Sequence, residues 1–80
     1  MNDSNMYNSL NIAEIIKNRA KTQKITIKDM LIELNLGSNT MSNMRHGRML
    51  GSDSLARIAD YLDCSTDYLL GRTDNPDINK

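Results

Sequence analysis

The chain has 80 residues but only one cysteine, Cys64, and one histidine, His46. A single domain of this size buries a small core, and natural domains this small usually add disulfides, a structural metal ion or closely packed helices. One cysteine cannot form an intramolecular disulfide, and one cysteine with one histidine cannot complete a Cys/His zinc site. Helix packing is the remaining source of stability, so the sequence predicts one domain with a helical core.

The apolar residues agree with a helical core. The chain has no Trp or Phe, one Pro and six Met, which indicates a core of Leu, Ile and Met. Apolar residues recur at spacings of three and four, the period of a helix with one buried face. The clearest runs are Ile12, Ile16 and Ala20, and then Leu55, Ile58, Ala59 and Leu62. No segment has a convincing strand pattern, so the predicted fold class is all-α.

Polar capping residues and glycines divide the chain into five predicted helices. The helices are expected at about residues 11–22, 26–34, 38–45, 52–62 and 65–70. The expected caps of the first, second, third and fifth helices are Asn11, Thr26, Ser38 or Gly37, and Ser65. Ser52-Asp53 opens the fourth helix, and Gly47 and Gly71 end the third and fifth helices. The order predicts a compact five-helix bundle.

The two ends of the chain are polar. We expect residues 1–10 to form a flexible amino-terminal arm, residues 11–71 the domain, and residues 72–80, which include Pro76, a flexible tail. The first residues lack the positive start and apolar core of a signal peptide, and no transmembrane run or lipidation motif follows. With its free thiol, the protein is expected in the cytoplasm, without a membrane partner.

Charge is distributed unevenly although the formal net charge is zero. Between residues 14 and 48 there are seven Lys or Arg against three acidic residues, whereas residues 53–80 hold three basic residues against six aspartates. A basic front half favours a nucleic-acid partner. The alternative is that these charges only solvate the surface.

The segment LNLGSNTMSNMRHGR, from Leu34 to Arg48, has unusual surface chemistry for a helix. Met41 and Met44 are three apart, as buried residues of a helix would be, and Asn35 suits the left-handed turn before it. The remaining residues are mostly amides and hydroxyls. Because such side chains can hydrogen-bond base edges in the major groove, the second and third helices are predicted to form a helix-turn-helix.

In these segments the sequence resembles the phage-repressor (Cro-like, Xre-like) helix-turn-helix family. The resemblance extends over about residues 12–75, and its last segment is typical of small repressors from Gram-positive bacteria and their phages. The segments that carry it are Ile25-Thr26, Leu34–Ser42, Gly47, Ser54–Leu62 and Ser65–Arg72.

The resemblance implies the five-helix phage-repressor fold and sequence-specific binding to duplex DNA. The side chains at base-reading positions are Ser38, Asn39, Ser42 and Asn43. An asparagine amide can pair with adenine through two hydrogen bonds, so Asn39 and Asn43 are the first choices. The expected phosphate contacts are Thr26, Lys28, Thr40, Arg45 and Arg48.

Three residues depart from the family pattern. Ile27 occupies a position where many members carry Gln, so a DNA contact is lost there or is replaced by one from Lys28. Leu31 takes the place of a frequent small Ala, which alters how closely the third helix packs. Arg45 replaces a frequent Glu and adds positive charge near the phosphates.

Several of these residues also have simpler interpretations. Asn39 and Asn43 can be exposed polar residues without a partner. His46 is either an exposed residue at the end of the third helix or a phosphate contact. Cys64 is interpreted as a small buried residue between the fourth and fifth helices rather than a redox centre.

The resemblance therefore implies a transcriptional regulator, a small repressor that binds a palindromic operator in duplex DNA. A homodimer would pair through residues 68–70 or form only on DNA. The alternative is a protein-interaction module on the same fold, such as an antitoxin or an inhibitor. No catalytic constellation is present, so an enzyme is not expected, nor is a cofactor, a metal ion or a small-molecule ligand.

Overall fold

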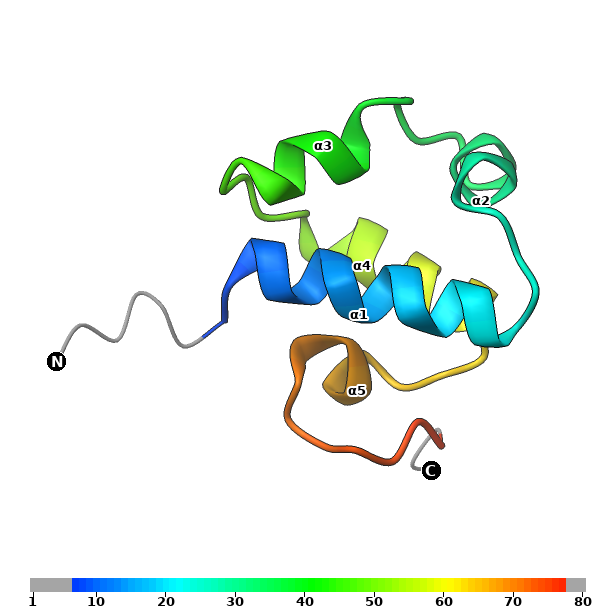
Figure 1. Ribbon diagram of the computed structural model, residues 1–80, viewed down its shortest axis with the longest axis vertical. Coiled ribbons are helices and arrows are strands. Elements are labelled where there is room, and N and C mark those ends of the chain that lie inside the picture. The colour runs from blue at the N-terminus through cyan, green and yellow to red at the C-terminus, as the bar shows by residue number, and fades with distance from the viewer. Residues whose placement is uncertain (1–6, 78–80) are drawn as a thin grey trace, which may run out of the picture.

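The structure is a computed structural model that describes residues 7–77. These residues form five helices and contain no strand (Figure 1). The helices are α1 (Ser9–Thr22), α2 (Ile27–Glu33), α3 (Thr40–Arg45), α4 (Ser52–Tyr61) and α5 (Thr66–Leu70). This confirms the predicted all-α class and the order of the helices. None of the helices in residues 7–77 is long and apolar enough to cross a membrane.

Two predicted helix starts are wrong. α1 is capped by Asn8 instead of Asn11, and the Asn8 side chain accepts hydrogen bonds from the backbone N–H groups of Leu10 and Asn11, so the helix begins at Ser9. α3 has Asn39 as its cap instead of Ser38 or Gly37. A turn in which Gly37 O accepts from Thr40 N at 3.1 Å occupies the residues before this helix and delays its start.

The caps of the second and fifth helices were predicted correctly. The Thr26 hydroxyl accepts a hydrogen bond from Asp29 N, and the Ser65 hydroxyl accepts one from Tyr68 N. The fourth helix begins at Ser52 as expected, with Gly51 as its cap.

All five helices end in the same way. After each helix one residue has a positive φ, and the N–H of the next residue bonds to the carbonyl five residues earlier, as in a Schellman motif. The left-handed residues are Lys24, Asn35, Gly47, Asp63 and Gly71, with φ between 55° and 97°. The corresponding N–H groups belong to Ile25, Leu36, Arg48, Cys64 and Arg72. This repeated ending turns the chain back onto the core after every helix.

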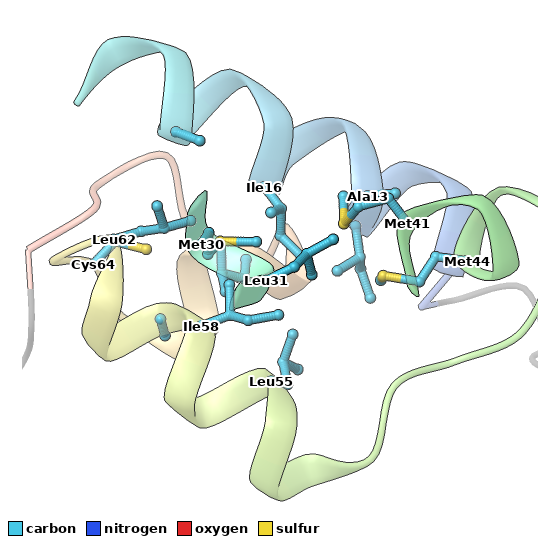
Figure 2. Packing of buried hydrophobic residues seen from close by; sticks show 14 residues of the cluster. Ala13, Ile16, Met30, Leu31, Met41, Met44, Leu55, Ile58, Leu62 and Cys64 are labelled. Atoms are coloured by element: carbon cyan, nitrogen blue, oxygen red, sulfur yellow. The ribbon is translucent and has the colours of Figure 1, made fainter. Parts of the chain in front are cut away.

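The core is built from the apolar stripe of each helix (Figure 2). Met41 and Met44 point from α3 toward Ala13 of α1, as their spacing predicts. The buried apolar residues are Ile12, Ala13, Ile16, Ala20, Met30, Leu31, Met41, Met44, Leu55, Ile58, Ala59, Leu62, Cys64 and Leu69. Close packing of aliphatic and sulfur-containing side chains therefore replaces the missing disulfide or metal.

The helix α1 lies between α3 on one side and α5 on the other, and it contacts both (Figure 1). The second and third helices consequently form one end of the molecule, and α5 packs against α1 and α4 away from that end. The predicted arm and tail fall partly outside the described residues, at 1–6 and 78–80. Within residues 72–77, Pro76 O accepts a hydrogen bond from Ser65 N at 2.9 Å. The boundaries of the arm, the domain and the tail stay predictions.

Candidate nucleic-acid interface

The turn between α2 and α3 is held by backbone and side-chain contacts. Asn35 takes the left-handed conformation, with φ 57°, which redirects the chain after α2. Leu36, directly after it, packs against the core from a half-buried position. From α4, the guanidinium of Arg57 donates a hydrogen bond to Leu34 O, the carbonyl at the end of α2. These contacts fix the angle at which α3 leaves the turn.

The carboxyl end of α3 is anchored to the first residue of α1. The Ser9 hydroxyl donates a hydrogen bond of 2.8 Å to Met44 O, and Ser9 is the one buried polar side chain among the described residues. The sequence interpretation missed this residue and placed it in the arm. Its spacing of three and four before Ile12 and Ala13 is the signal that puts it on the buried face of α1.

The four residues predicted to read bases lie on or just before α3. Ser38, Asn39 and Ser42 are exposed and Asn43 is half-buried. Asn39 is the cap of α3, yet its side chain makes no capping hydrogen bond. Its amide is therefore not used by the helix and can bond to a group outside the protein. The buried face formed by Met41 and Met44 leaves these polar residues on the outer surface.

Two predicted phosphate contacts are threonines that use their hydroxyls differently. Thr26 accepts from Asp29 N at 3.1 Å, which leaves the hydroxyl proton for an outside acceptor such as a phosphate oxygen. The Thr40 hydroxyl donates to Gly37 O at 2.7 Å, so in this rotamer its proton is already committed. The two side chains are thus unequal candidates for a phosphate contact.

The other predicted phosphate contacts carry positive charge. Lys28 on α2, Arg45 in the last turn of α3 and Arg48 just after it are all exposed. The backbone N–H of Arg48 donates to Asn43 O at 2.9 Å, which fixes Arg48 next to α3. His46, between the two arginines, is exposed as well.

Arg19, counted above among the basic residues of the front half, has a structural role instead. Its Nε donates to Leu62 O at 3.0 Å, and a terminal nitrogen donates to Asp63 O at 2.7 Å. The side chain therefore caps the carboxyl end of α4, where a positive charge is favourable. Its charge cannot be assigned to a DNA contact, and nothing in the sequence around Arg19 signals this long-range partner.

Cys64 lies away from this surface, in the turn between α4 and α5. Its side chain is 1% exposed. Burial raises the pKa of the thiol, while the nearby positive charge of Arg19 partly opposes that increase. A neutral buried thiol is a poor nucleophile and a good packing group. No cluster of metal-binding side chains occurs within residues 7–77 either.

Of three comparisons with known proteins, one gave a match, and it agrees with this geometry. Searches of curated proteins and of solved structures gave no match. The family model for the Cro/C1-type HTH DNA-binding domain matches residues 15–75, which include all of α2 to α5. Since this match spans most of the chain and contains the observed helix-turn-helix, the protein belongs to the Cro/C1-type helix-turn-helix DNA-binding family.

Proposed function

We propose that the protein is a cytoplasmic transcriptional repressor that reads an operator in the major groove with α3. The observation that carries the proposal is the division of α3, together with the two residues before it, into a buried face and an exposed face. Met41 and Met44 are buried against the bundle, whereas Ser38, Asn39 and Ser42 are exposed. An α-helix fits the major groove, where short polar side chains can match the donors and acceptors of particular bases.

The proposed phosphate contacts flank this helix on both sides. Thr26 and Lys28 lie at the start of α2, and Arg48 follows α3. Contacts of this kind carry little sequence information but fix the position of the protein on the duplex. Once α3 is in the groove, the bound protein would block access of polymerase to the promoter.

We further propose that two copies bind adjacent half-sites about one helical turn apart, ~34 Å. One small domain makes few phosphate contacts, so a single copy would bind weakly and with strong salt dependence. Among residues 68–70, Leu69 is 0% exposed and cannot take part in an interface, so that only the half-buried Tyr68 and Leu70 remain as apolar contacts. A small patch of this kind favours pairing that forms on DNA rather than in free solution.

Selection of bound duplexes from a random pool tests this function. The expected result is an enriched sequence with two inverted half-sites, together with a monomer in sedimentation experiments without DNA. If no sequence is enriched, the proposed function is wrong. The alternative would then be a protein-interaction module on the same fold, such as an antitoxin or an inhibitor.

A further inference from the structure

An apolar groove of about 270 Å³ lies between the α2 helix and the turn that leads to α3. Its lining residues are Ile27, Leu31, Ile32 and Leu36, together with Lys28 and Ser38. Ile32 is 63% exposed, the highest value among the large apolar side chains described. The groove is therefore open on the surface and is not a part of the core that the bundle has closed.

The position of Ile27 in this groove is next to the proposed DNA contacts. Thr26 and Lys28, its neighbours in the chain, are proposed phosphate contacts, and Lys28 also lines the groove. Ser38, a proposed base-reading residue, lines it too. A duplex that touches both Lys28 and Ser38 would lie along the groove that Ile27 lines with them, and the charge of Lys28 complements the DNA backbone.

Only one group on the major-groove edges of the bases is apolar, the 5-methyl group of thymine. A half-buried isoleucine has no hydrogen-bonding group for a base, but it can cover this methyl group and exclude water from it. We propose that Ile27 contacts a thymine methyl group and so determines one position of the half-site. This role rests on the proposed binding of DNA by α3.

Deoxyuridine tests the contact because it differs from thymidine only by the missing methyl group. In the duplex obtained by selection, each thymine is replaced singly by uracil, and the Kd of the protein is measured. For the wild-type protein, the Kd should rise about fourfold when one particular thymine of a half-site is replaced. This factor corresponds to the burial of one methyl-sized group. The Ile27→Gln variant should bind the two duplexes equally well.

Two further variants serve as controls. Leu10→Gln makes the same change at an apolar residue on α1 that is 46% exposed and outside the proposed interface, and it should retain the fourfold preference. Ile27 packs partly against the core, so Ile27→Thr, which keeps a β-branched side chain, replaces Ile27→Gln if that variant fails to fold. Ile27→Thr should also lose most of the preference.

The role of Ile27 is overturned if no thymine is sensitive to the replacement. It is also overturned if the sensitive thymine remains equally sensitive in Ile27→Gln and Ile27→Thr. Both results leave the proposed function intact, because a selected sequence already exists in that case. If selection enriches no sequence, the proposed function and the role of Ile27 fail together.

Discussion

The side-chain amides of Asn39 and Asn43 illustrate what single residues contribute to α3. Asn43 lies inside the helix, where Lys or Glu would be a better helix former, whereas Asn39 occupies the cap position, where Asn is a favourable residue. Asn39 begins the helix without making a capping bond, and Asn43 holds its side chain at the half-exposed border of the buried face. The cost of Asn43 to the helix and the unused amide of Asn39 are both understandable if these amides bind bases, as proposed.

Replacement of Asn43 by alanine tests this interpretation at one residue. Asn43→Ala should weaken binding to the selected site by about 1–3 kcal/mol and relax the preference at one base pair, because one bidentate contact is lost. Affinities for the selected duplex and for random duplexes are measured by fluorescence anisotropy. An equal loss on both kinds of DNA would show that Asn43 does not read a base.

Replacement of Arg48, unlike that of Asn43, should weaken binding without changing the sequence preference. This side chain is exposed beside α3 and is proposed to bind a phosphate, which every sequence presents. Arg48→Ala should therefore weaken binding to all duplexes similarly and reduce the slope of log K against log salt by about one unit. The slope is obtained from titrations at four salt concentrations. An unchanged slope would remove Arg48 from the phosphate contacts.

The ends of the helices mark how far local sequence determines each element. Asn35, Gly47 and Gly71 were predicted to end α2, α3 and α5, because Asn and Gly tolerate the left-handed conformation. Lys24 adopts the same conformation without that preference, and Asp63, which tolerates it less commonly than Asn or Gly, adopts it as well. The residues after them, Ile25 and Cys64, pack on the core, so tertiary burial imposes these two turns.

The start of α1 also depends on tertiary contacts that the local sequence does not indicate. The pattern Asn11-Ile-Ala-Glu14 resembles a helix start, but Ser9 is buried and already helical. Because Ser9 is polar, it does not contribute to the apolar periodicity that indicates the other buried positions of α1. Only its partner, Met44 O on α3, makes the burial of Ser9 understandable.

The bond between α1 and α3 can be tested with a matched pair of serines. Ser9 and Ser52 are each the first residue of a helix, α1 and α4, but Ser9 is buried and bonded whereas Ser52 is exposed. Ser9→Ala should lower the free energy of unfolding by about 0.5–1.5 kcal/mol, because Met44 O loses a buried donor.

In the matched variant, Ser52→Ala should change the unfolding free energy by less than about 0.5 kcal/mol. Urea denaturation followed by circular dichroism measures both variants. If the two serines proved equivalent, the Ser9 bond would contribute nothing beyond helix propensity, and the anchoring of α3 would have to come from Met41 and Met44 alone.

For the whole molecule, the sequence predicts the helices and the face of α3 but not the bonds that hold the helices together. Ser9 to Met44, Arg57 to Leu34 and Arg19 to Leu62 connect residues 35, 23 and 43 positions apart. Each is a side chain bonded to a backbone carbonyl, and every residue offers such a carbonyl. Periodicity and capping rules therefore contain no information about which one is chosen. The outward residues Ser38, Asn39 and Ser42 depend on local pattern and could be identified.

The buried thiol couples the stability of the whole bundle to pH. The folded state raises the pKa of Cys64 above its ordinary value of 9.0, so folding favours the neutral thiol. This contribution is fully present below pH 9 and is lost as the pH rises through the higher pKa of the folded state.

The corresponding experiment compares the wild-type protein with Cys64→Ala at pH 7 and pH 10. Tyrosines and lysines also titrate over this range, but they are common to both proteins, so their effects cancel in the difference. The unfolding free energy of the wild-type protein should fall more than that of Cys64→Ala. An equal fall in both would mean that Cys64 titrates alike in the folded and unfolded states.

The proposed function attributes the sequence specificity of the protein to the outward side chains on α3 and just before it. The most direct measurement is the ratio of affinities for the selected duplex and for a scrambled duplex of the same composition. It is made for the wild-type protein and for a variant with alanine at Ser38, Asn39, Ser42 and Asn43. We predict a ratio of about 10³ or more for the wild-type protein and a ratio near one for the variant, with weak binding to both duplexes retained. A wild-type ratio near one, or an unchanged ratio in a folded variant, would contradict the claim.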